Sequence, residues 1–134
     1  MNKNIFVNLP VKDLDRSKAY FAKLGYTFNA QFTNETAACM VISENIFAML
    51  ITHARFSDFT AKAIADSDKT TEVLIALSCE SKEEVAHFAE KALAAGATEA
   101  KEKQDHGFMV VRSISDLDGH IWEYMWMDPG HVQG

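Results

Sequence analysis

Basic side chains are scarce in this sequence, and their scarcity argues against a nucleic-acid partner. The 134 residues contain 13 Lys and Arg against 19 Asp and Glu, which gives a formal net charge of −6. Proteins that bind phosphate backbones cluster Lys and Arg on one face or along one helix, and no such basic stripe occurs here. We therefore expect partners other than DNA or RNA.

Long apolar runs are also missing. The longest ones, such as residues 46–51, are far shorter than the roughly 20 apolar residues that span a bilayer as a helix. The polar start Met1-Asn2-Lys3-Asn4 leads directly into a strand-like run and lacks the apolar core of a signal peptide. These features predict a cytoplasmic protein without a membrane partner.

Cysteines and closely spaced histidines are too few for the common metal motifs. Cys39 and Cys79 lie 40 residues apart in apolar segments, without CxxC spacing. We expect two buried, reduced thiols that pack as small apolar side chains. No two histidines are spaced i,i+2 on a predicted strand or i,i+4 on a predicted helix; the five are His53, His87, His106, His120 and His131.

The sequence does contain the same order of secondary-structure elements twice. In the first half, runs of β-forming residues predict strands at 5–11, 26–32, 37–43 and 46–52. After the first strand, apolar residues recur at helical spacing from Leu14 to Leu24. Asp13 or Asp15 can cap this helix, and Gly25 ends it.

The second half repeats this order. Strands are predicted at 72–79, 97–103, 108–114 and 121–127. The helix between the first two begins at the capping box Ser81-Lys82-Glu83-Glu84 and stops at Gly96. Residues 53–69 connect the halves as an excursion with room for one short helix.

This order predicts an α+β fold of two tandem βαβββ modules. We place module 1 at about residues 4–52, the excursion at 53–69 and module 2 at about 70–128, within a single domain of residues 1–134. Each module should form a curved sheet with its helix on one face. The two uncovered faces would then enclose a cleft suited to a small ligand.

One carboxylate, Glu123, interrupts the apolar strand that follows the turn Asp116-Leu117-Asp118-Gly119. Buried charge is costly unless it is paired, protonated or bound to a metal. Strand periodicity puts Glu123 on the same face as Ile121 and Met125. It is therefore a candidate catalytic base or ligand-binding group, and the alternative is a remnant paired with Arg112 or another cation, or hydrogen-bonded to Asn8.

The chain resembles the vicinal oxygen chelate superfamily, which includes glyoxalase I, extradiol dioxygenases, fosfomycin-resistance transferases and bleomycin-resistance proteins. The resemblance covers nearly the whole chain and implies the glyoxalase/bleomycin resistance/dihydroxybiphenyl dioxygenase fold. The motifs that carry it are Leu9-Pro10-Val11-Lys12-Asp13-Leu14-Asp15-Arg16-Ser17, Tyr20-Phe21, Leu24-Gly25-Tyr26, Ala94-Ala95-Gly96-Ala97 and Asp116-Leu117-Asp118-Gly119-His120-Ile121-Trp122-Glu123.

The resemblance also implies four positions for a divalent metal, from the first and last strand of each module. These positions fall on Phe6, Met49, Leu74 and Glu123, so only Glu123 retains a family ligand. Phe and Leu cannot ligate a metal, and a thioether is too soft for Mg, Mn or Fe(II). We therefore predict no cofactor and disfavour a divalent metal, while a non-family site that combines Glu123 with His53 or His106 stays open.

The same positions assign the cleft face of each of the other strands. On the last strand, Trp122, Tyr124 and Trp126 then face the helices. The resulting cleft is mostly apolar with a few polar groups, as small-molecule sites usually are. Arg112, on the neighbouring strand, could meet an anionic ligand. Asp105-His106-Gly107 reads as a loop at the cleft mouth. The predicted ligand-binding residues are Phe6, Asn8, Phe47, Met49, Glu72, Leu74, Arg112, Ile121 and Met125, with Glu123 the candidate catalytic residue.

Three hypotheses about function follow. In the first, a metal-free protein of the glyoxalase/bleomycin-resistance type binds a small, partly apolar organic molecule. In the second, a lactoylglutathione lyase-like or extradiol dioxygenase-like enzyme recruits a metal through Glu123 and non-family ligands. In the third, an exposed aromatic face makes the chain a protein-interaction module. Under each of them the resemblance implies a homodimer.

Overall fold

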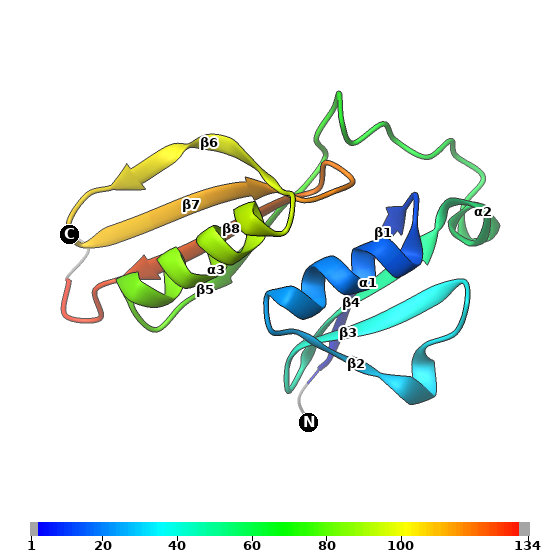
Figure 1. Ribbon diagram of the computed structural model, residues 1–134, viewed down its shortest axis with the longest axis horizontal. Helices are drawn as coiled ribbons and strands as arrows, with labels where there is room; N and C mark the ends of the chain where they lie inside the picture. The colour runs from blue at the N-terminus through cyan, green and yellow to red at the C-terminus, as the bar shows by residue number, and fades with distance from the viewer. Residues whose placement is uncertain (1–2, 132–134) are drawn as a thin grey trace. The chain divides into compact units, whose positions relative to one another are not determined.

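The computed structural model describes residues 3–131, and the chain divides into two compact units, Met1–Asp66 and Ser67–Gly134. Each unit holds a four-stranded mixed sheet with a long helix on one face (Figure 1). The predicted α+β fold of two tandem βαβββ modules is thereby confirmed.

Unit 1 has the strand order β1-β4-β3-β2, with β1 parallel to β4 and the other pairs antiparallel. Asp13 is the helix cap, because its carboxylate accepts a hydrogen bond from the Arg16 amide at 3.1 Å. The elements are β1 (Ile5–Val11), α1 (Leu14–Lys23), β2 (Thr27–Asn29), the 3-10 turn η1 (Ala30–Phe32), β3 (Ala37–Ser43), β4 (Ile46–Thr52), α2 (His53–Phe56) and η2 (Ser57–Phe59).

Unit 2 repeats this topology with the order β5-β8-β7-β6, and β5 is parallel to β8. Ser81 caps its helix, as the capping box predicts, by accepting a hydrogen bond from the Glu84 amide at 3.1 Å. The elements are β5 (Leu74–Ser78), α3 (Lys82–Ala94), β6 (Thr98–Asp105), β7 (Met109–Ser115) and β8 (Ile121–Met127).

In each unit the core lies between the sheet and its long helix. In unit 2 the ring of Tyr124 on β8 stacks on Phe88 of α3 with centroids 5.1 Å apart. Trp122 lies on the same face of β8 and is 1% exposed. The helix-facing side of unit 1 is filled by Leu9, Val11, Tyr20, Phe21, Leu24, Met40, Ala48 and Leu50, all buried.

The strand predicted at 26–32 is wrong after its first few residues. β2 stops at Asn29, and a 3-10 turn follows. The Asn29 carboxamide accepts a hydrogen bond from the Gln31 amide at 3.0 Å, and the Thr33 hydroxyl donates to the Asn29 carbonyl at 2.8 Å. Such local side-chain bonds compete with a strand ladder, and here they end it.

The other differences are shifts of strand ends. β5 begins at Leu74, so Glu72 precedes the strand and is exposed. β6 runs to Asp105, two residues beyond the prediction, and the register between β6 and β7 shifts between Glu99 and Lys101 and again before Gln104. Such bulges lengthen one strand relative to its partner, which composition does not reveal.

Both cysteines are free, as predicted, but their surroundings differ, since Cys39 is buried and Cys79 is half-buried. Burial, together with the neighbouring Glu84 carboxylate, raises the pKa of the Cys79 thiol to about 11 from 9.0, and burial also raises the pKa of Cys39. Because the folded protein holds the Cys79 proton more tightly than the unfolded chain, this group loses its stabilising contribution as the pH rises from 9.0 toward 11.

We expect both thiols to resist alkylation in the native protein, because the thiolate is the nucleophile. With iodoacetamide at pH 8.5, mass spectrometry should show slow labelling of native protein and rapid labelling of both cysteines in urea. Native labelling of Cys79 as fast as that of a free cysteine would contradict its raised pKa.

Among residues 3–131, no helix is both long and apolar enough to cross a membrane.

Candidate functional site

The face of each sheet that is turned away from its long helix carries nearly all of the predicted site residues. We call these the unit 1 open face and the unit 2 open face. In unit 1, Asn8 on β1 is the register partner of Met49 on β4. Phe6 and Phe47 form the adjacent pair, with stacked rings 4.9 Å apart and 12° from parallel.

Phe6 is 46% exposed, and Phe47 and Met49 are half-buried. These apolar side chains are therefore not part of the core under α1. Asn8 is exposed beside them, and its amide donates to the Phe6 carbonyl at 3.2 Å. The unit 1 open face thus offers an aromatic pair, a thioether and one carboxamide.

The unit 2 open face is centred on Glu123. Glu123 on β8 is the register partner of Ala76 on β5 and of Ser113 on β7. The Ser113 hydroxyl donates a hydrogen bond to Glu123 Oε2 at 3.1 Å. Ser113 is 5% exposed, whereas Glu123 is half-buried. The apolar neighbours on this face include Leu74, Ala76, Val111, Ile121 and Met125.

Arg112 does not share this face. It is the register partner of Tyr124, so its side chain lies on the helix-facing side of β7. Its guanidinium donates to Glu99 on β6 (Nη2–Oε1, 2.5 Å) and to Glu90 on α3 (Nη1–Oε1, 3.2 Å). The guanidinium therefore ties the helix to the edge strand, and it neither pairs with Glu123 nor faces a ligand on the open face.

The turn before β8 sets the position of Glu123. Asp116 is 8% exposed, and its Oδ1 accepts hydrogen bonds from the amides of Asp118 (2.9 Å) and His120 (3.0 Å). Its Oδ2 accepts from the Trp122 indole Nε1 at 2.9 Å. Burial raises the pKa of the Asp116 carboxyl, while the charge of His120 and these hydrogen bonds oppose the rise.

The connecting segment also holds this turn. The Ser67 hydroxyl donates to the Asp118 carbonyl at 2.5 Å. Gly119 has φ +88°, and a Cβ placed there would lie 2.5 Å from the Ser67 carbonyl oxygen. Only glycine fits this close approach, so the turn, the connecting segment and the start of β8 form one packed corner.

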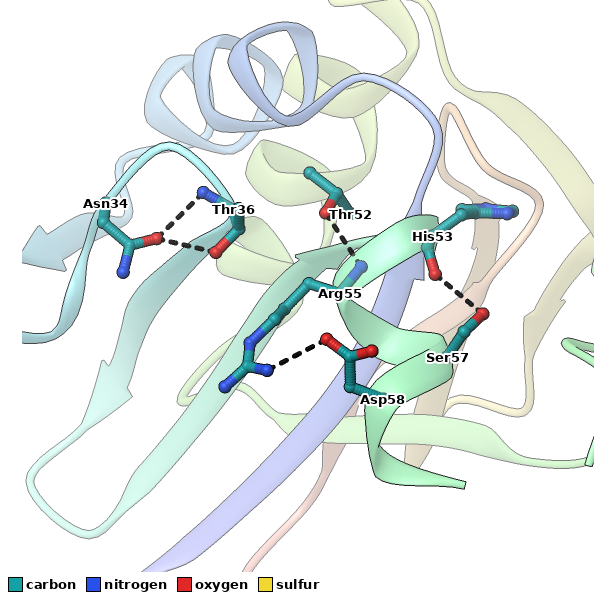
Figure 2. A network of polar contacts seen from close by, with 7 residues as sticks. All are labelled: Asn34, Thr36, Thr52, His53, Arg55, Ser57 and Asp58. Carbon is teal, nitrogen blue, oxygen red and sulfur yellow. Dashed lines mark hydrogen bonds and ion pairs between the residues drawn. The ribbon is translucent and has the colours of Figure 1, made fainter. Parts of the chain in front are cut away.

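The remaining candidates are His53 in unit 1 and the Asp105–His106 turn in unit 2. His53 is exposed at the start of α2, where its carbonyl accepts from the Ser57 hydroxyl at 3.0 Å; Figure 2 shows it beside the Arg55–Asp58 ion pair. His106 is exposed at the β6–β7 turn. There the Asp105 carboxylate accepts from the Gly107 amide, and this bond lowers the pKa of Asp105. The Asp105 carboxylate thus stabilises its own turn by a local hydrogen bond.

The residues present do not fit the superfamily's metal. Phe6, Met49 and Leu74 lie on the open faces of their sheets, where the resemblance puts the ligands, but Phe and Leu have no donor atom. Within residues 3–131, no group of three or more His, Cys, Asp or Glu side chains is arranged to hold a metal ion.

Ser113 was not among the residues predicted from sequence, yet it is the hydrogen-bond donor to Glu123. Its position could have been found by counting outward from the turn. The Asp116 amide bonds to the His120 carbonyl, so Ser115 pairs with Ile121 and Ser113 pairs with Glu123.

Comparisons with known proteins agree with this fold. A family model described as "Bleomycin resistance protein-like N-terminal" matches residues 3–43. A hypothetical protein from S. aureus is 24% identical, with a TM-score of 0.79 and 94% of each chain covered. A glyoxalase/bleomycin resistance protein/dioxygenase family enzyme from Burkholderia phytofirmans is 14% identical, with a TM-score of 0.76 over 94% of this chain and 99% of that one. The fosfomycin resistance protein FosX from Listeria monocytogenes is 18% identical, with a TM-score of 0.68 over 100% and 95%. No curated protein sequence matches the chain.

The chain therefore has the fold shared by glyoxalases, bleomycin resistance proteins and related dioxygenases. The solved structures support this fold over nearly the whole chain, and the family model matches residues 3–43.

Proposed function

We propose that the protein binds a small, partly apolar organic molecule at an open face of its sheets, without the divalent metal of the superfamily. The observation that carries this proposal is the composition of those faces. Large apolar side chains stand partly exposed on regular strands, with Phe6 at 46% and Leu74 at 55% exposure. A few polar groups among apolar ones are typical of small-molecule sites.

The position of the long helices supports the same proposal. The long helices of both units pack on the opposite sides, and the polar groups on the open faces include Asn8 and the hydrogen-bonded Ser113–Glu123 pair. Proteins of the same fold are named for resistance to bleomycin and to fosfomycin, both of them organic molecules. We take the protein to act in the cytoplasm as a homodimer.

A thermal-shift screen of aromatic and thiol-conjugate compounds tests the proposal. We expect at least one compound to raise the melting temperature of the wild type and not that of Phe6→Asp, which puts a charge on the unit 1 open face. Phe32→Asp is the matched control, because Phe32 is 56% exposed but lies in the turn η1. Equal responses in both variants, or no response to any compound, would count against binding at the open face.

The competing reading is a lyase or dioxygenase that holds a metal through Glu123 and non-family ligands. The retained Glu123 is the observation in its favour. A near-stoichiometric Ni, Zn, Mn or Fe in protein purified without chelators, lost in Glu123→Gln, would support that reading.

A further inference from the structure

The Ser113–Glu123 pair indicates which chemical group a ligand would present to unit 2. Glu123 accepts one hydrogen bond, at Oε2 from the Ser113 hydroxyl. Within the described part of unit 2, no side chain donates to Oε1 and no cation pairs with the carboxylate. The Ser113 hydroxyl therefore holds Oε2 in place, and Oε1 can accept a hydrogen bond from a ligand.

Two basic residues of the unit 2 sheet lie near Glu123 in the strand register, Arg112 and Lys101, and neither forms an ion pair with it. Arg112 is held on the opposite face by Glu99 and Glu90. Lys101 is the register partner of Ser113 on the edge strand β6, so the width of β7 separates it from Glu123, and it makes no ion pair with that carboxylate. Within the described part of unit 2, the carboxylate therefore makes no ion pair, and Lys101 is on the same face one strand beyond Ser113.

A half-buried carboxylate among apolar groups is unfavourable until an opposite charge reaches it. Apolar ligand surface against Ile121 and Met125 would bury Glu123 further, which raises that cost unless the ligand itself supplies the charge. A hydrogen bond from an ammonium to a carboxylate is charge-assisted and roughly twice as strong as a neutral one.

We propose that the ligand carries a protonated amine that donates to Glu123 Oε1, and that Ser113 is a positioning residue that orients the carboxylate to accept it. This inference rests on the proposed function, because it requires that an apolar body bind the open face. The net charge of −6 favours the approach of a cation over that of an anion.

Three naphthalene probes of similar size test the inference by isothermal titration calorimetry at pH 7.5. They are 2-(1-naphthyl)ethylammonium, 2-(1-naphthyl)ethanol and 3-(1-naphthyl)propanoate. We expect the ammonium to bind the wild type about tenfold more tightly than the alcohol, and the carboxylate more weakly than either. In Glu123→Gln, which keeps size and shape, the three affinities should converge at the value of the alcohol.

Ser113→Ala should reduce the preference for the ammonium about threefold while leaving the alcohol's affinity unchanged, because only the orientation of the carboxylate is lost. Ser113→Thr keeps the hydroxyl on a strand and should restore the preference. Lys101→Ala should leave the preference in place or increase it. A preference that appears only in Lys101→Ala would mean that Lys101 neutralises Glu123, which would overturn the inference.

The outcomes distinguish a failure of the ammonium inference from a failure of the proposed small-molecule binding. If the three probes bind the wild type equally, or if the preference survives in Glu123→Gln, the ammonium inference is wrong and the binding function stands. If the carboxylate binds most tightly, the inference is likewise wrong. If no probe binds at millimolar concentration, both fail.

Discussion

Replacing Gly119 with alanine should destabilise the protein by about 2–5 kcal/mol, because two penalties add. The residue has φ +88°, where a Cβ is strained, and that Cβ would lie 2.5 Å from the Ser67 carbonyl oxygen and 2.8 Å from Asp68 Oδ1. A backbone carbonyl cannot rotate away as a flexible side chain can. Urea denaturation should show a lower midpoint with an unchanged slope.

Gly25→Ala is the matched control. Gly25 has φ +104°, but a Cβ there would meet nothing within 4 Å. Its substitution should therefore cost only the backbone strain, about 1–2 kcal/mol. Equal losses at the two glycines would mean that the Ser67 carbonyl does not press on the turn, and the packed corner would be wrong.

Replacing Asp116 with alanine should cost about 3 kcal/mol or more, since three donors lose their acceptor at once and each unsatisfied buried donor costs about 1–3 kcal/mol. The donors are the Asp118 and His120 amides and the Trp122 indole. Asp116→Asn should cost less, because its carbonyl oxygen can still accept the two amide bonds.

A double-mutant cycle isolates the indole bond. Trp122→Phe removes the donor to Asp116 Oδ2, so Asp116→Ala combined with Trp122→Phe should destabilise by less than the sum of the two single changes. Strict additivity in urea denaturation would show that the carboxylate and the indole do not stabilise each other.

The sequence predicted the strands best where a dense run of β-forming residues is followed directly by turn residues. The bounds of β3, β4 and β8 agree with the prediction residue for residue, because dense β-forming runs end there at clear turn signals. The glycines Gly25 and Gly96 end their helices as predicted, with φ of +104° and +111°. These are local signals, and local signals suffice for such boundaries.

Two side chains were misplaced or overlooked because their partners lie ten or more residues away, and one strand was misjudged because of a local bond. Arg112 was expected at the ligand, yet Glu90 and Glu99, 22 and 13 residues away, hold it on the other face. Ser113 was overlooked because its importance comes from pairing with Glu123 across the hairpin. The strand predicted at 26–32 failed because the Asn29 side chain bonds to its own backbone neighbourhood, which periodicity does not record.

The central claim is that ligand binding needs an open sheet face and no metal, and calorimetry of chelator-treated protein tests it most directly. Protein purified without chelators would be analysed for metals, split, and one half treated with EDTA. Both halves would then be titrated with 2-(1-naphthyl)ethylammonium, or with the most stabilising compound from the thermal-shift screen. The account predicts substoichiometric metal and the same affinity in both halves. A stoichiometric metal whose removal abolishes binding would contradict it.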